Sequence, residues 1–187
     1  IKEYYEEYGV NVHRGVYGLS YKATDEYEET RNVVAKFLNA SSEEIVFTKG
    51  TTASLNLVAS SYGMANINEG DEIIVSELEH HSSVMPWQEV AKIKKAKLVF
   101  VPLDNEGRIT VENFKSVLTN KTKIVALTYV SNVMGYISPI KEIIELFKAK
   151  AEMRELEKGI KTEEDLVDYF FGEKVQDINL RESGVEA

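Results

Sequence analysis

Four short segments of this chain carry side chains that could bind or transform a small molecule. They are Gly50-Thr51-Thr52, His80-His81, Asn132 and His13-Arg14-Gly15. Backbone N–H groups and threonine hydroxyls at the start of a helix suit a phosphate, because the helix dipole adds positive charge there. An imidazole can stack on a flat heterocycle and pass protons near neutral pH. An asparagine amide can donate to a phenolate-like oxygen, and the last segment could offer a base or a carboxylate anchor.

Each segment also has a plainer interpretation, and both interpretations stay open at this point. Glycine followed by threonine at a helix start is often ordinary capping, Asn132 could form a turn, and the three histidines could lie in surface loops. Two other kinds of site are disfavoured. His80 and His81 have no third ligand at metal-binding spacing, and the chain has no Gly-x-Ser-x-Gly elbow of a serine hydrolase.

The elements that would position these segments alternate between strand and helix. Strands are predicted over residues 44–48, 72–75, 97–102 and 123–130, and helices over 51–64, 84–95, 111–118 and 138–148. Such alternation indicates βαβ units, and so an α/β fold with a largely parallel sheet and flanking helices. Ligands of these sheets sit beyond the carboxyl ends of the strands. That rule points to residues 48–52, 76–83 and 129–135, which contain most of the candidate side chains.

The two ends of the chain depart from this pattern. Residues 1–8 place an isoleucine and three tyrosines at helical spacing, so we expect a helical start that continues from earlier sequence. Thr24 is expected to cap the next helix. Residues 151–187 carry most of the net charge of −9, and residues 162–172 predict a helix. We therefore divide the chain into an α/β domain, residues 1–150, and an acidic helical tail, residues 151–187.

Composition limits the classes of function. The 187 residues are 43% hydrophobic and 28% charged, as in a globular domain. A net charge of −9 argues against a nucleic-acid-binding surface, which needs clustered cations. The apolar runs are too short to span a membrane, and no secretory leader opens the chain, so we expect a cytoplasmic protein. The absence of cysteine excludes disulfides and thiolate metal ligands within this sequence.

Several motifs, in order along the chain, together resemble one enzyme family. They are Asn11 to Gly15, Glu44 to Thr52, Asn66 to Val75, Glu79 to His81, Pro86 to Gln88, and Val130 to Gly135. Over residues 1–148 the sequence resembles the SUF-type cysteine desulfurases and the related selenocysteine lyases, which belong to the class V aminotransferases. The resemblance implies part of the large domain of a pyridoxal-phosphate-dependent transferase of fold type I.

The resemblance also implies roles for individual residues. Thr51 and Thr52 would hold the phosphate of pyridoxal 5′-phosphate, His80 would stack on its ring and take part in catalysis, and Asn132 would contact its phenolic oxygen. His13 would lie near the substrate as a second catalytic residue. Tyr129 stands where many family members have histidine. An intact member would be a homodimer that converts L-cysteine to alanine and passes a persulfide to a sulfur-acceptor protein for iron–sulfur cluster assembly.

Other residues that the family uses have no match in this sequence. The family places the lysine that carries the cofactor, the persulfide cysteine, the pyridine-nitrogen aspartate and the carboxylate-binding arginine after the helix that is predicted to end near Lys148. None of them matches residues 151–187. We therefore expect a chain that is catalytically inactive by itself, without a covalently attached cofactor. The alternatives are a non-catalytic scaffold or interaction module that keeps the fold, and another class V aminotransferase or lyase.

Overall fold

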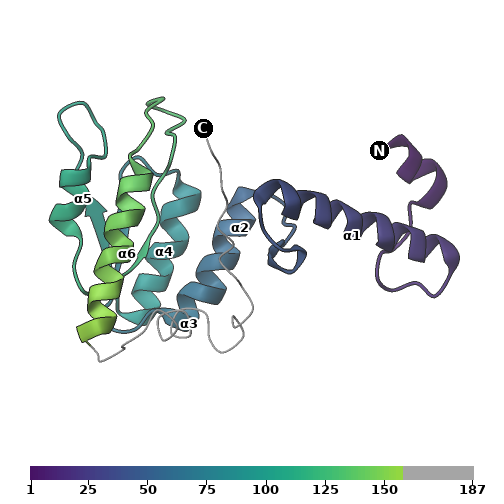
Figure 1. Ribbon diagram of the computed structural model, residues 1–187, viewed down its shortest axis with the longest axis horizontal. Coiled ribbons are helices and arrows are strands. Elements are labelled where there is room, and N and C mark those ends of the chain that lie inside the picture. Colours follow the sequence, from purple (N-terminus) through teal and green to yellow (C-terminus); the bar gives the residue numbers. More distant parts are fainter. Residues whose placement is uncertain (158–187) are drawn as a thin grey trace. The chain divides into compact units, whose positions relative to one another are not determined.

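The computed structural model describes residues 1–157 of the chain, and the chain divides into two compact units (Figure 1). The N-terminal unit is Ile1–Lys49 and the C-terminal unit is Gly50–Ala187. No helix within residues 1–157 combines the length and the apolar character that a membrane crossing requires. The helix expected over residues 162–172 lies outside the described residues.

The N-terminal unit is built around one long helix. Its elements are a π-helical turn, η1 (Tyr4–Tyr8), the helix α1 (Gly18–Leu38) and a 3₁₀ turn, η2 (Ser42–Glu44). The helical start is confirmed. The prediction that Thr24 caps a helix is wrong, because α1 begins at Gly18 and the Thr24 hydroxyl instead accepts the N–H of His13 at 2.9 Å. The helix ends at Asn39, which takes the left-handed conformation with φ 53°.

The strand expected over residues 44–48 is also absent from the structure. Ser42–Glu44 forms the 3₁₀ turn, whose capping box joins Ser41 and Glu44 reciprocally. Residues 45–48 are irregular and pair with no strand. The apolar run of Ile45, Val46 and Phe47 fits a strand, but a strand also needs a neighbour whose N–H and C=O groups complete the ladder.

The C-terminal unit contains a parallel sheet of three strands. They are β1 (Glu72–Ser76), β2 (Lys97–Val101) and β3 (Thr122–Val125), in the order β2-β1-β3. Ile74 of the central strand is paired with Val99 of β2 and with Val125 of β3. All residues of β1 are buried, which is the pattern of a strand covered on both faces.

Helices cover both faces of the sheet because successive residues of β1 point in opposite directions. Ile73 and Val75 pack in one core cluster with residues of α4 (His81–Lys94), whereas Ile74 packs in a second cluster with residues of α5 (Val111–Val117) and α6 (Ile140–Glu157). A further helical segment precedes β1 and runs through α2 (Thr51–Val58), the π turn η3 (Ala59–Gly63) and α3 (Met64–Asn66). The α/β fold with a parallel sheet and flanking helices is confirmed.

The strand order shows where ligands are expected to bind in such a sheet. The chain leaves β1 through α4 on one face of the sheet, and it leaves β3 through α6 on the other face. When neighbouring parallel strands continue on opposite faces, a crevice is expected beyond their carboxyl ends. In this unit that place lies between the segments that follow Ser76 and Val125.

Helix α6 is longer than the sequence pattern indicated. It continues through residue 150 to Glu157, and Nη1 of the buried Arg154 donates to the carbonyl of Thr122 at 3.0 Å. The last described turn of α6 is therefore tied to the first residue of β3. Ser138, which precedes this helix, is buried, and its hydroxyl has no hydrogen-bond partner among residues 1–157.

Candidate functional site

The start of α2 has the properties of an anion-binding helix terminus. Its N-cap is Gly50, with φ 152° and ψ 176°, a conformation that is essentially restricted to glycine. A glycine cap has no side chain to accept the first N–H groups of the helix, and these groups have no carbonyl partner within it. A Cβ added at Gly50 would meet no atom within 4 Å. The exposed hydroxyls of Thr51 and Thr52 lie in this first turn.

His80 is the N-cap of α4 and follows the buried strand β1 by a short loop. Its Nδ1 accepts the N–H of Ser82 at 3.2 Å and lies 2.8 Å from the Ser82 hydroxyl. An Nδ1 that accepts from a backbone N–H is unprotonated, so the proton of the neutral ring is assigned to Nε2. The His81 ring meets the His80 ring edge-on, with centroids 6.3 Å apart. The capping bond thus fixes the orientation of the exposed His80 ring.

One open cleft brings the helix start and the histidine together. The cleft has a volume of about 420 Å³ and is lined by Thr52, Asn56, His80, His81, Ser82, Met85, Pro86 and Glu89. Thr52 comes from the first turn of α2, and His80 caps α4. A helix start that suits a phosphate and an imidazole therefore line the same concave surface. This combination fits a phosphorylated aromatic ring.

Asn132 lies in a separate turn that follows β3. Val130 and Ile137 form an antiparallel bridge, and the Ser131 hydroxyl accepts the N–H groups of Val133 at 3.3 Å and Met134 at 3.1 Å. Asn132 is exposed and is not among the residues that line the cleft. The turn fixes its backbone, as the plainer interpretation expected, and its proposed contact with a ligand stays a prediction.

Sequence reasoning missed Glu79, which joins the loop after β1 to the segment after β3. Its Oε1 accepts the hydroxyl of Ser76 at 2.8 Å and the N–H of Thr128 at 2.6 Å. Partial burial raises the pKa of the Glu79 carboxyl, and the hydrogen bonds from Ser76 and Thr128 oppose that shift. The available signal was an acidic residue three positions after the end of a strand whose central residues, Ile73 to Val75, are all apolar.

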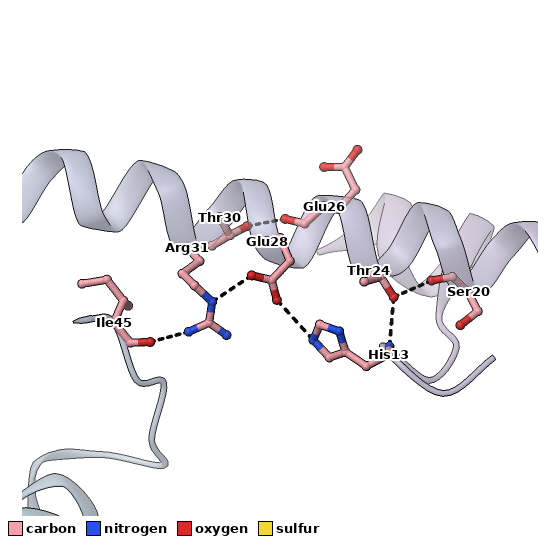
Figure 2. A network of polar contacts seen from close by, with 8 residues as sticks. All are labelled: His13, Ser20, Thr24, Glu26, Glu28, Thr30, Arg31 and Ile45. Carbon is pink, nitrogen blue, oxygen red and sulfur yellow. Dashed lines mark hydrogen bonds and ion pairs between the residues drawn. The ribbon is translucent and has the colours of Figure 1, made fainter. Parts of the chain in front are cut away.

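His13 belongs to the N-terminal unit, where it forms part of a polar network along α1 (Figure 2). It has a positive φ of 64°, which is unusual for a residue other than glycine. Its Nε2 lies 3.2 Å from Oε1 of Glu28, and its ring meets the Tyr27 ring edge-on at 5.5 Å. The other oxygen of Glu28 accepts from Nε of Arg31 at 3.0 Å.

Arg31 connects this network to the loop that precedes the C-terminal unit. Its guanidinium lies over the rings of Tyr27 at 5.2 Å and Phe47 at 5.0 Å, and its Nη1 donates to the carbonyl of Ile45. The hydrogen bond to Glu28 raises the pKa of Arg31 above its usual value. A glutamate that is held by an arginine on one side can orient an imidazole on the other.

Comparison with known proteins identifies the family. A profile described as Aminotransferase class-V matches residues 1–154. A probable cysteine desulfurase of Halalkalibacterium halodurans is 52% identical over 147 residues, which are 78% of this chain and 36% of the relative. A probable cysteine desulfurase of Staphylococcus aureus is 53% identical over 136 residues, which are 72% of this chain and 33% of the relative. The chain thus spans about a third of the length of the curated relatives it matches.

Solved structures give the same result. The apo structure of a cysteine desulfurase from Thermococcus onnurineus NA1 has a TM-score of 0.73 at 43% identity, and the match covers 80% of this chain and 37% of that one. The cysteine desulfurase CsdA from Escherichia coli has a TM-score of 0.68 at 36% identity, over 80% and 38% of the two chains. The resemblance that the motifs indicated is confirmed, and so is the relation to part of a fold type I large domain.

Proposed function

We propose that this chain, which belongs to the aminotransferase class-V family, provides part of the pyridoxal-phosphate site of a cysteine desulfurase, an enzyme that takes sulfur from L-cysteine. The observation that carries the proposal is the cleft that Thr52 and His80 line together. The family depends on pyridoxal phosphate, and the relatives named cysteine desulfurase support the choice of substrate.

The start of α2 and His80 have separate tasks in this proposal. The first-turn N–H groups of α2 and the hydroxyls of Thr51 and Thr52 bind the phosphate, because Gly50 leaves that helix end without a capping side chain. His80 stacks on the pyridine ring, and its neutral imidazole keeps a proton on Nε2 while Nδ1 is held by Ser82. The bound cofactor would supply an electron sink for chemistry at the substrate carbon.

Two residues outside the cleft complete the proposed set. Asn132 donates its amide N–H to the phenolic oxygen of the cofactor from the turn that follows β3. His13 acts near the substrate, where Glu28 at 3.2 Å orients its imidazole. Both assignments rest on the motifs that these residues share with the family.

The 187-residue chain has no cysteine, so it cannot itself form a protein persulfide. We propose that by itself it binds the cofactor without turnover, and that any persulfide forms on a thiol from another polypeptide or segment. A non-catalytic interaction module is the second candidate, because the same lack of cysteine favours it. Cytoplasmic residence, a homodimer and a sulfur acceptor that serves iron–sulfur cluster assembly are further parts of the proposal.

Binding of pyridoxine 5′-phosphate to the 187-residue chain tests the site directly. This compound keeps the ring and the phosphate but has an alcohol in place of the aldehyde, so it cannot condense with surface lysines. Calorimetric titration should give saturable binding, which His80→Ala and Thr52→Ala each weaken by about tenfold. Gln88→Ala, an exposed change on α4 outside the cleft, should leave the affinity unchanged. Equal affinity of the wild type and the His80→Ala variant would refute the assignment.

A further inference from the structure

Within the described part of the C-terminal unit, one polar link joins the segments that follow β1 and β3. A single carboxylate oxygen of Glu79 accepts a hydroxyl from the end of β1 and a backbone N–H from the segment after β3, at 2.8 and 2.6 Å. The second bond joins residues that are 49 positions apart in the chain. Glu79 therefore adds a side-chain link between the two strand exits to the backbone pairing of β1 with β3.

The partner of Glu79 at the end of β1 is itself held in place. The hydroxyl of Ser76, which is fully buried, accepts the N–H of Leu78 at 3.3 Å. The carboxylate of Glu79 thus accepts from the end of β1 and from the segment after β3. His80 follows the first of these places in the chain, and Asn132 follows the second.

His80 follows Glu79 directly in sequence, so the position of one restricts the other. The backbone of Glu79 is held at Ser76, where its N–H meets the carbonyl at 3.4 Å, and its side chain is held at Thr128. The His80 ring is then oriented by Ser82. On the other side of the crevice, Thr128 begins the short stretch that leads to Asn132.

We propose that Glu79 is a positioning residue, which holds the His80 ring at the spacing from the β3 exit that a bound pyridine ring requires. The proposal rests on the proposed function. A carboxylate that has lost part of its hydration is costly unless donors replace the water, and the Ser76 and Thr128 bonds are such donors. Glutamine can accept the same bonds through its own Oε1, whereas leucine has a similar size and accepts none.

A double-mutant cycle in the 187-residue chain tests the proposal, with pyridoxine 5′-phosphate as the probe and calorimetry as the readout. Glu79→Leu should weaken binding by about tenfold, and Glu79→Gln should stay within about threefold of the wild type. In the His80→Ala background, Glu79→Leu should cost less than about twofold, because a residue that acts through the ring has nothing left to position. Glu77→Leu, an exposed change in the same loop, is the matched control.

The outcomes separate the two proposals. If His80→Ala weakens binding and Glu79→Leu does not, or if Glu79→Leu costs the same in both backgrounds, the positioning role is overturned and the cofactor site stands. If His80→Ala itself has no effect, the proposed function fails. If circular dichroism shows that Glu79→Leu does not fold, Ser76→Ala replaces it in the cycle, because this change removes one donor to the carboxylate. The proposal is then overturned if Ser76→Ala weakens binding equally in the wild-type and His80→Ala backgrounds.

Discussion

Nε2 of His13 lies 3.2 Å from Oε1 of Glu28, a partly buried residue of α1. The same carboxylate binds Arg31, which in turn reaches the loop at Ile45, so one chain of contacts holds the segment before α1 and the segment after it (Figure 2). Because the guanidinium also lies over two aromatic rings, those of Tyr27 and Phe47, its planar shape contributes as well as its charge.

We expect Arg31→Ala to lower the melting temperature, and Arg31→Lys to leave it close to the alanine value. A lysine ammonium can pair with Glu28, but it cannot make the forked hydrogen bonds and stack on the rings of Tyr27 and Phe47 at once. Thermal unfolding followed by circular dichroism measures both. Arg14→Ala, an exposed arginine of the same unit, serves as the control, and full recovery of stability by lysine would contradict the stacking argument.

The stability of the chain should depend on pH through Glu79. Burial raises the pKa of this carboxyl in the folded state, so its contribution to stability is present below the ordinary glutamate pKa of about 4.3 and is lost as pH rises through the raised value. The free energy of unfolding of the wild type relative to Glu79→Gln should therefore fall between about pH 4 and neutrality. Urea unfolding of both proteins at several pH values gives the difference between their free energies of unfolding. The other carboxyl groups contribute equally to both proteins, so their effects cancel in this difference. A constant or rising difference would show that burial does not control the pKa of Glu79.

Gly63 should not tolerate a side chain. A Cβ there would lie 2.8 Å from the Trp87 ring, so Gly63→Ala forces the indole or the η3 turn to move, at a cost of about 1–3 kcal/mol. Trp87 is the only tryptophan in the sequence, so its fluorescence spectrum reports the shift directly. Gly18→Ala, where a Cβ meets nothing within 4 Å, should be neutral or stabilising by up to about 1 kcal/mol. An unchanged emission spectrum in Gly63→Ala would count against the close packing.

The central strand should dominate the stability of the C-terminal unit. Ile74 is fully buried in β1, so Ile74→Ala should cost about 2–5 kcal/mol through lost burial and the cavity left behind. Ile93→Ala on α4, where the side chain is 54% exposed, should change stability by less than about 0.5 kcal/mol. Chemical denaturation of both variants makes the comparison, and similar costs would mean that the assigned burial is wrong.

The sequence predicts the sheet better than it predicts the N-terminal unit. Residues 72–75, 97–102 and 111–118 combine apolar runs with clear breaks, and the structure has β1, β2 and α5 there. Residues 44–48 have a similar apolar run but no neighbouring strand. Strand pairing depends on residues far apart in the sequence, so the local pattern does not predict it. The predicted start of α1 was wrong for a related reason. The Thr24 hydroxyl accepts the N–H of His13, which is 11 positions away, and it caps no helix.

The candidate site shows the same division between local and non-local information. Thr52 and His80 were chosen from local patterns, at a helix start and after a strand, and the structure brings both to one cleft. Their roles, and those of Thr51, Asn132 and His13, stay predictions. Glu79 escaped notice because its main partner, Thr128, is brought to it only by the pairing of β1 with β3.

The strand order β2-β1-β3 also sets when the crevice can exist during synthesis. The start of α2, the strand β1 and His80 emerge from the ribosome early, and β1 can pair with β2 soon afterwards. The crevice, however, also needs β3 and the N–H of Thr128, which follows Glu79 by 49 residues. Closing such a long loop precedes any gain from the contact, so it is a late step in folding. A nascent chain stalled before residue 122 would contain the start of α2 and His80, but it would lack the Thr128 N–H that binds Glu79.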